Sequence, residues 1–220
     1  MAYIDFLSSI HKSTKRDYLC RVNEYPKAEA IKKAKMYDYD YWDGDRKFGY
    51  GGYKYDGRWQ KVAKAIVDHY GLKKGDRVLD VGCGKSFLLY DLAQIVPGIE
   101  VQGIDISQYA IEHAKEEVRQ FLKVGNATSL PYKDKSFDLV ISINTLHNLF
   151  CYDLTQALKE IERVGKKNKY VVVESYRNEE EKVNLMYWVL TGECFFSPDE
   201  WKWFYELAGY SGDHSFIYFE

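Results

Sequence analysis

From Trp59 onward, short apolar segments alternate with segments of helical periodicity, and this alternation constrains the fold more than any other feature of the chain. The first apolar run, RVLDVG, is typical of a buried strand, and the SFLLYDLAQIV that follows it is typical of a helix. Strands that alternate with helices predict an α/β fold with a doubly wound, mostly parallel sheet. We expect strands at 77–82, 100–106, 121–125, 137–143, 169–176 and 214–219, and helices at 59–70, 86–96, 107–118, 153–165 and 197–209.

The residues before this pattern have a different composition. The first 36 are rich in lysine, and KAEAIKKAKMY after Pro26 is typical of a helix, because proline suits a first helical turn. Tyr41 to Trp59, which we call the ribbon, holds seven aromatic residues and five glycines in nineteen positions. Neither a helix nor a strand favours that mixture. We therefore expect an N-terminal extension and lid at 1–58 and one α/β domain at 59–220.

Composition excludes several classes of function. The 220 residues carry a formal net charge of −2 with no long block of like charge, so no nucleic-acid footprint is indicated. The four cysteines form no CxxC pair, which argues against a metal site or a disulfide framework. The first residues lack the pattern of a signal peptide, and no apolar run approaches the roughly 20 residues that span a bilayer. We expect a soluble, cytoplasmic protein with no nucleic-acid or membrane partner.

Glycines after the first strand, in VLDVGCGKSF, predict a ligand at the carboxyl end of the sheet. Three ligand classes use such loops. A P-loop for a nucleoside triphosphate needs glycine where this chain has Leu79. A dinucleotide fingerprint needs glycine where this chain has Phe87. Both patterns are therefore incomplete. The third ligand class that uses such loops is S-adenosylmethionine.

The chain resembles the class I S-adenosylmethionine-dependent methyltransferases over residues 73–176. VLDVGCGKS is similar to the first motif of that family, EVQGIDIS to the second, and VGNATSLPYKDKSFDLVISINTLHNL to the third and fourth in unbroken order. Each motif alone is weak, but four in order are specific. The resemblance implies a Rossmann-like fold, S-adenosylmethionine as cofactor, and cofactor contacts from Asp80, Gly82, Cys83, Gly84, Asp105, Ile106, Asn126, Ala127 and Asn144.

The chemistry of these residue types fits that assignment. Asp80 can hold the ammonium group of the cofactor, and the two loop glycines permit a close backbone approach. Asp105 ends the second strand and can accept from both ribose hydroxyls, although it can also be a helix cap. Two positions depart from the family pattern. Ser86 stands where glycine is common, and Asn126 stands where aspartate is common, but an asparagine still accepts from the adenine amino group.

The candidate catalytic residues follow strands four and five. His147 is either a general base or a positioning histidine, and the sequence leaves both roles open. Glu174 and Tyr176 are expected to border the same cavity. A DNA adenine methyltransferase would carry a Pro-Pro-aromatic sequence after Asn144, and this chain does not. A catechol-type metal site would need clustered carboxylates there, and only Asp153 is close.

These exclusions leave a small polar molecule as the expected acceptor. The ribbon offers aromatic faces and hydroxyls for it, and we expect contacts from Tyr41, Tyr50, Tyr53 and Arg58. The alternative is a ribbon that only packs on the domain. The ribbon is similar to the leading segment of bacterial methyltransferases that accompany surface-glycan assembly, which implies a sugar, a nucleotide-sugar or a phosphorylated glycan precursor. The other reading is a catalytically silent S-adenosylmethionine-binding protein or partner subunit.

Overall fold

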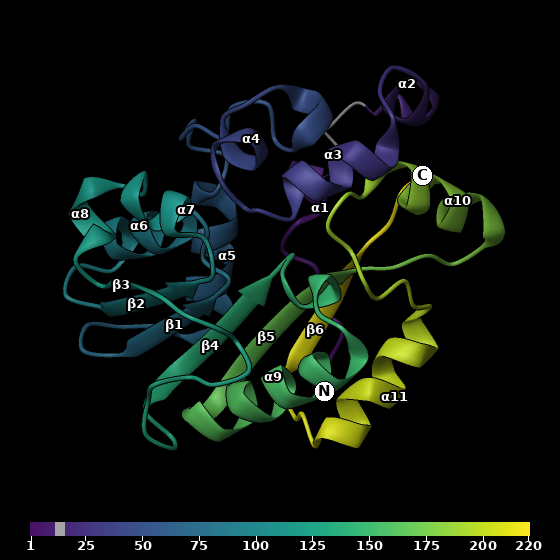
Figure 1. The fold of residues 1–220 in the computed structure, drawn as a ribbon. Helices are drawn as coiled ribbons and strands as arrows, with labels where there is room; N and C mark the ends of the chain where they lie inside the picture. The colour runs from purple at the N-terminus through teal and green to yellow at the C-terminus, as the bar shows by residue number, and fades with distance from the viewer. Residues whose placement is uncertain (12–15) are drawn as a thin grey trace.

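A six-stranded sheet forms the centre of the computed structural model, which describes residues 1–11 and 16–220. The strand order is β3-β2-β1-β4-β5-β6, and every neighbouring pair runs parallel (Figure 1). The predicted α/β fold with a mostly parallel sheet is thus confirmed. The strands are β1 (Arg77–Val81), β2 (Glu100–Asp105), β3 (Leu122–Val124), β4 (Phe137–Ile143), β5 (Gly165–Glu174) and β6 (Asp213–Ile217).

Helices cover both faces of this sheet (Figure 1). On one face α5 (Gln60–Tyr70) and α6 (Phe87–Ile95) share a core cluster with strand residues such as Val78. On the other, α9 (Cys151–Val164) and α11 (Pro198–Ala208) share a second cluster with residues such as Leu79. Successive side chains of a strand point to opposite faces, so both must be apolar. This explains why the strand segments are continuous apolar runs rather than alternating ones.

Local sequence signals set most helix ends. Gly71 ends α5 in the left-handed region at φ 63°, and Ser197 and Glu200 form a capping box at the start of α11. The helix expected at 107–118 is wrong as a single element. It is divided into α7 (Gln108–Glu112) and α8 (Glu116–Arg119), because Lys115 between them has an extended conformation.

Residues 16–58 of the N-terminal extension lie over the carboxyl ends of the strands (Figure 1). The elements of the extension are α1 (Ser8–His11), α2 (Tyr18–Asn23), α3 (Lys27–Ala34), α4 (Tyr39–Trp42) and the short η1 (Arg46–Phe48). The helix predicted after Pro26 corresponds to α3. The ribbon contains α4, η1 and turns, and α10 (Glu179–Trp188) packs beside α2. Gly49 has no room for a side chain, since an added Cβ would lie 2.0 Å from the carbonyl oxygen of Tyr41.

The outer edge of β6 is covered by the first residues of the chain. Tyr3 forms a parallel bridge with His214, and Ile4 N–H donates to the His214 carbonyl at 2.9 Å. In return, His214 N–H donates to the carbonyl of Ala2 at 3.0 Å. These bonds occupy an edge that would otherwise present unpaired backbone groups.

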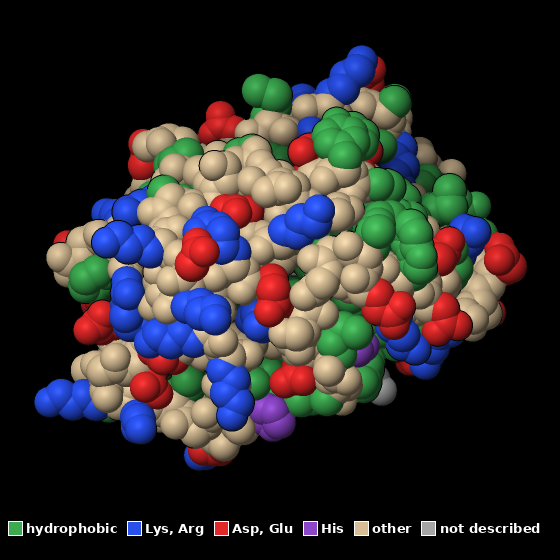
Figure 2. All heavy atoms as spheres, turned by 90° about the horizontal axis from the view of Figure 1, so that it is seen from below, with side chains coloured by type: hydrophobic (Ala, Val, Ile, Leu, Met, Phe, Trp, Pro, Cys, Tyr) green, Lys and Arg blue, Asp and Glu red, His purple; other side chains and the backbone are tan. Residues whose placement is uncertain are grey.

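At the opposite end, near the amino ends of the strands, Lys and Arg side chains are interspersed with Asp and Glu (Figure 2). This mixture matches the balanced net charge of the sequence. None of the helices in the described ranges is long and apolar enough to cross a bilayer.

Candidate active site

A cavity of about 1010 Å³ lies between the carboxyl ends of the strands and the N-terminal extension. It joins the glycine loop after β1 to the ribbon and to the segment after α10. Most residues predicted for the site line this one cavity, although they come from distant parts of the sequence. They are Asp80, Gly82, Cys83, Gly84, Asp105, Ile106, Asn126, Ala127, Asn144, His147, Glu174, Tyr41, Tyr50, Tyr53 and Arg58.

Two glycines shape the loop after β1. Gly82 has φ 82°, and a Cβ there would lie 2.1 Å from Oγ1 of Thr145. Gly84 has φ 51°, and a Cβ there would lie 2.7 Å from the ring of Trp42. Both positions therefore require glycine for space as well as for conformation. Main-chain groups of this loop therefore line the cavity, where they can contact a cofactor.

Two buried carboxylates stand beside this loop. Asp105 accepts from Gly84 N–H at 2.7 Å and from Ser107 N–H at 2.8 Å, while its burial raises its pKa. Burial, with a contribution from Asp105, raises the pKa of Asp80 to about 7. Oδ1 of Asp80 is buried without a hydrogen-bond partner among the described residues. An orphaned carboxylate oxygen on a cavity wall fits a cationic group such as an ammonium.

His147 and Glu174 form a buried pair at the ends of β4 and β5. Glu174 N–H donates to Nδ1 of His147 at 3.4 Å, and Nε2 of His147 lies 3.2 Å from Oε2 of Glu174. This pattern assigns the ring proton to Nε2, facing the carboxyl group. Burial lowers the pKa of His147 to about 3 and raises the pKa of Glu174 to about 8.

These values separate the two roles left open for His147. A general base works best with a pKa near the operating pH, and His147 is far below it. Both of its ring nitrogens also face groups of Glu174. The pair therefore favours a positioning histidine, with Glu174 as the group of suitable basicity.

The expectation that Tyr176 borders the cavity is wrong. Tyr176 is absent from the described residues that line it, and Nζ of Lys182, a residue of α10, lies 4.9 Å from its ring centroid. Residues two apart in a strand point to the same face, but β5 ends at Glu174, so Tyr176 lies beyond the strand and does not follow Glu174 into the cavity.

Side-chain contacts join the ribbon to the glycine loop after β1 and to the segment after β2. Nζ of Lys85, beside the glycine loop, donates to Oδ1 and Oδ2 of Asp43 at 2.7 and 2.6 Å. Nε1 of Trp42 donates to Oγ of Ser107 at 2.9 Å, just beyond β2. The Tyr53 ring stacks on Phe87, the first residue of α6, at 4.9 Å between centroids.

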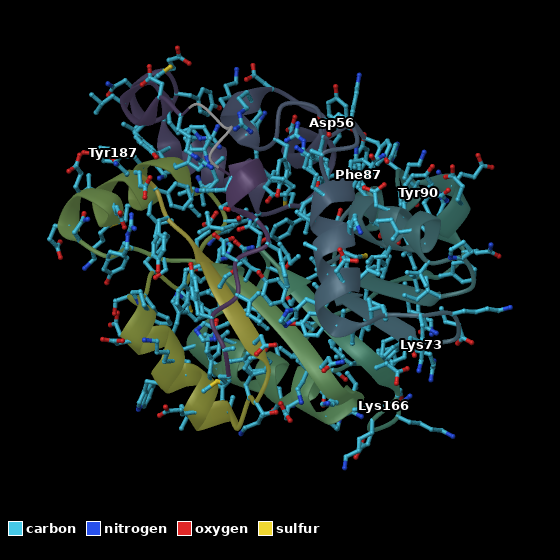
Figure 3. The ribbon with its side chains drawn as sticks, turned by 180° about the vertical axis from the view of Figure 1, so that it is seen from behind. Asp56, Lys73, Phe87, Tyr90, Lys166 and Tyr187 are labelled. Atoms are coloured by element: carbon cyan, nitrogen blue, oxygen red, sulfur yellow. The ribbon has the colours of Figure 1, made fainter. Side chains whose placement is uncertain are left out.

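Figure 3 shows this arrangement from behind. Asp56 of the ribbon lies at the end of the molecule that carries Phe87 and Tyr90 of α6, whereas Lys73 and Lys166 lie at the other end of the sheet. The ribbon thus covers the carboxyl ends of the strands, where the cavity is.

Some cavity residues were missed by the sequence analysis. Trp42 and Thr145 contact the two loop glycines, and Arg16, Arg21 and Trp188 line the far wall. No motif distinguishes them, because their place depends on how the extension and α10 pack. Among the described residues, no group of three or more His, Cys, Asp or Glu is arranged to hold a metal ion.

Residues 72–209 match the family of methyltransferase domains. That match covers more than half of a chain whose fold and glycine loop are those expected from its motifs. The chain belongs to the class I S-adenosylmethionine-dependent methyltransferases. The chain is 35% identical over 118 residues to the demethylmenaquinone methyltransferase of Symbiobacterium thermophilum, an alignment that covers 50% of this chain and 46% of the relative. The chain thus spans about half the length of the curated relatives it matches.

Solved structures share the fold of this chain. The YcgJ protein from Bacillus subtilis superposes with a TM-score of 0.55 at 21% identity, covering 66% of either chain. The cyclase SpnF superposes with a TM-score of 0.54 at 23% identity, covering 71% of this chain and 60% of SpnF. At these identities the likeness concerns the fold, and the acceptor must be argued from the cavity.

Proposed function

We propose that the protein transfers a methyl group from S-adenosylmethionine to a small polar acceptor, with a sugar, a nucleotide-sugar or a phosphorylated glycan precursor as the expected classes. The observation that carries this proposal is the single cavity that joins the glycine loop, Asp80 and Asp105 to Glu174 and the ribbon. The division into an extension and lid at 1–58 and a catalytic domain at 59–220 is part of it. We expect the enzyme to act in the cytoplasm.

The cofactor end of the cavity suits S-adenosylmethionine, which supplies an electrophilic methyl group on its sulfonium. The orphaned Oδ1 of Asp80 suits the ammonium group of the amino-acid part. Asp105 suits the ribose hydroxyls, with Asn144 and the loop glycines beside it. Ile106 is 60% exposed and can pack on the adenine ring, flanked by Asn126 and Ala127.

The acceptor end needs a group that takes up a proton and a wall that excludes water. Glu174 is the proposed general base, and the proton of an acceptor hydroxyl would pass to its carboxylate. His147 is the proposed positioning residue, since its Nε2 lies 3.2 Å from Oε2 of Glu174. Tyr41, Tyr50 and Tyr53 of the ribbon close the cavity, and closure of this kind strengthens polar contacts inside. Arg58 lies at the rim beside Asp56.

Calorimetry with four ligands tests the cofactor assignment. S-adenosylmethionine and S-adenosylhomocysteine are expected to bind, because the orphaned carboxylate and the short loop fit them. ATP and NAD are expected not to bind, since Leu79 and Phe87 replace the glycines that their loops require. Tighter binding of ATP or NAD than of S-adenosylmethionine would contradict the proposal.

Label transfer from S-adenosylmethionine carrying a tritiated methyl group tests the activity. The protein is incubated with a metabolite extract, and with demethylmenaquinone, the acceptor in the name of several relatives, as a separate sample. A labelled small molecule supports an enzyme and identifies its acceptor. Cofactor binding without any label transfer would favour the alternative, a silent binding protein or partner subunit.

A further inference from the structure

One wall of the cavity gathers three arginines around a single indole ring. The guanidinium carbons of Arg21 and Arg46 each lie 5.0 Å from the centroid of the Trp188 ring, and that of Arg16 lies 5.5 Å from it. All four residues line the cavity, and we call them the arginine wall. They come from the N-terminal extension and from the end of α10, so the wall exists only when these parts are packed together.

Arg21 and Arg46 are held in this wall by backbone carbonyls. Nε of Arg21 donates to the Trp188 carbonyl at 3.3 Å, and its Nη1 donates to the carbonyl of Arg46. Nη1 of Arg46 donates to the carbonyls of Gly49 and Tyr50 at 2.9 and 3.0 Å. Across residues 1–11 and 16–220, neither guanidinium forms an ion pair with a carboxylate. Carbonyls orient these two cations but do not neutralise them.

In the described part of the chain, no acidic residue of the cavity lining is paired with Arg21 or Arg46. Asp80 and Asp105 stand at the glycine loop, and Asp56 is bound by Arg58 at 2.5 to 2.9 Å. Burial raises the pKa of the Glu174 carboxyl group, and the charge of Arg16, which lies near it, opposes this rise. Arg21 and Arg46 are therefore available to an anionic ligand in the cavity.

Burial of these cations is costly in the absence of a ligand. It lowers the pKa of Arg21 to about 10, with a further contribution from the neighbouring charge of Arg46. The pKa values of Arg16 and Arg46 are lowered by burial as well. Perturbed charges that line a cavity are candidates for a binding site.

We propose that the arginine wall binds a phosphoryl group of the methyl acceptor, a phosphate monoester or a diphosphate, with Arg21 and Arg46 as the principal donors. This inference rests on the proposed function, because the ligand is the acceptor of the same site. A guanidinium offers paired N–H donors that match phosphate oxygens. A phosphate monoester carries about −1.5 to −2 charges at neutral pH, which matches two arginines better than a single carboxylate does.

Calorimetry with pyrophosphate, in a buffer free of phosphate and with S-adenosylhomocysteine saturating, tests this proposal. We expect the wild type to bind pyrophosphate, and Arg21→Gln and Arg46→Gln each to bind it at least about tenfold more weakly. Lys133→Gln and Lys167→Gln are the matched controls. They remove the same charge at exposed lysines near the amino ends of β4 and β5, and we expect no loss of pyrophosphate affinity.

The outcomes separate this proposal from the function on which it rests. If the wild type binds S-adenosylhomocysteine but not pyrophosphate, the arginine wall is no phosphoryl site and the methyltransferase assignment stands. If S-adenosylhomocysteine itself does not bind, the proposed function is wrong. Malonate that binds as tightly as pyrophosphate would overturn the choice of a phosphoryl group over a carboxylate.

A second measurement uses the wild type alone, because Arg21 and Arg46 also tie the extension to the domain. Butanedione modifies accessible guanidinium groups, and mass spectrometry locates the modified residues. We expect pyrophosphate to protect Arg21 and Arg46 and to leave the modification of Arg119, outside the cavity lining, unchanged. Equal modification of Arg21 and Arg46 with and without pyrophosphate would contradict the proposal.

Discussion

Asp105 already uses both carboxylate oxygens within the protein, on the N–H groups of Gly84 and Ser107. Each oxygen keeps a further lone pair for a ribose hydroxyl. We expect Asp105→Ala to weaken S-adenosylhomocysteine binding by about 2–4 kcal/mol, since charged hydrogen bonds contribute about 1.5–3 kcal/mol each and are not additive. Calorimetry measures the affinity, and a thermal melt shows whether the variant is folded. Unchanged affinity in a folded variant would mean that Asp105 only orders the two loops.

We expect Asp80 to make cofactor affinity depend on pH. Its raised pKa, about 7, means that the free protein holds a proton there in weak acid. Pairing with an ammonium requires the ionised form, so the proton must leave on binding. We expect S-adenosylhomocysteine affinity to fall as pH is lowered from 7.5 to 5.5, by up to about tenfold per unit below the pKa. Asp80→Asn should bind S-adenosylhomocysteine more weakly at pH 7.5, and its affinity should no longer change with pH. If the affinity of Asp80→Asn still falls at low pH, another group causes the dependence.

At the scale of elements, one ion pair joins the ribbon to the glycine loop. The side chain of Lys85 is 5% exposed and that of Asp43 is 20% exposed, so removal of Asp43 leaves a buried charge without its partner. We expect Asp43→Ala to lower the free energy of unfolding by about 3 kcal/mol. The double variant Asp43→Ala with Lys85→Met should lose less, because no buried charge remains. Urea unfolding measures both, and equal losses would show that the pair does not couple ribbon and loop.

The ribbon itself is expected to be dispensable for the fold of the α/β domain. The two clusters that pack against the sheet contain no buried residue from 47–55, and only Phe48 of a small separate cluster would be lost. We expect deletion of residues 47–55 to keep the domain folded by circular dichroism, and to abolish methyl transfer while weakening cofactor binding far less. If the deletion variant is unfolded, the ribbon is needed for the fold. If the variant keeps full activity, the ribbon has no role in closing the cavity.

Elements with local signals were predicted well from the sequence, and those without them were not. Gly71 and the Ser197 capping box mark real helix ends. The break at Lys115 carries neither glycine nor proline, and it occurs where Lys115 N–H reaches the carbonyl of Lys85 in another element. The division of 107–118 is thus a tertiary effect that periodicity does not reveal.

At the scale of the whole molecule, Glu174 couples stability to pH. Its pKa of about 8 in the folded protein exceeds the ordinary value of 4.5, so the folded protein holds a proton that the unfolded chain releases. The stabilisation of the folded state by this proton is fully present below pH 4.5 and is lost as the pH rises to 8. We expect the free energy of unfolding of the wild type, minus that of Glu174→Gln, to fall between pH 5 and 8 by at most about 1.4 kcal/mol per pH unit.

His147 changes the free energy of unfolding with pH in the opposite direction. Burial lowers the pKa of His147 to about 3, so below pH 6.5 the unfolded chain binds a proton that the folded protein does not. Since His147 is present in both proteins, the comparison with Glu174→Gln isolates the carboxyl group. Urea unfolding at several pH values measures the difference. A difference that does not change with pH would show that Glu174 is ionised throughout.

The two ends of the cavity differ in how far the sequence predicted them. Asp80, Gly82 and Asp105 belong to strands and loops of one motif series, so their order along the chain already places them together. Arg21 and Trp188 lie in segments without a distinctive pattern, 167 positions apart. Their meeting depends on the packing of α2 against α10, which only tertiary structure defines.

The pairing of the first residues with β6 gives the protein an order of assembly. The N–H of Ala2 donates to Oδ1 of Asp213, which lies 211 positions later in the chain. At roughly 5–20 residues per second, a ribosome needs roughly 10–40 seconds to make the second partner after the first. Arg21 meets its partner Trp188 only when α10 has been made, 167 positions after Arg21 and well after the glycine loop. We therefore expect a nascent chain halted before α10 to carry the glycine loop without the arginine wall.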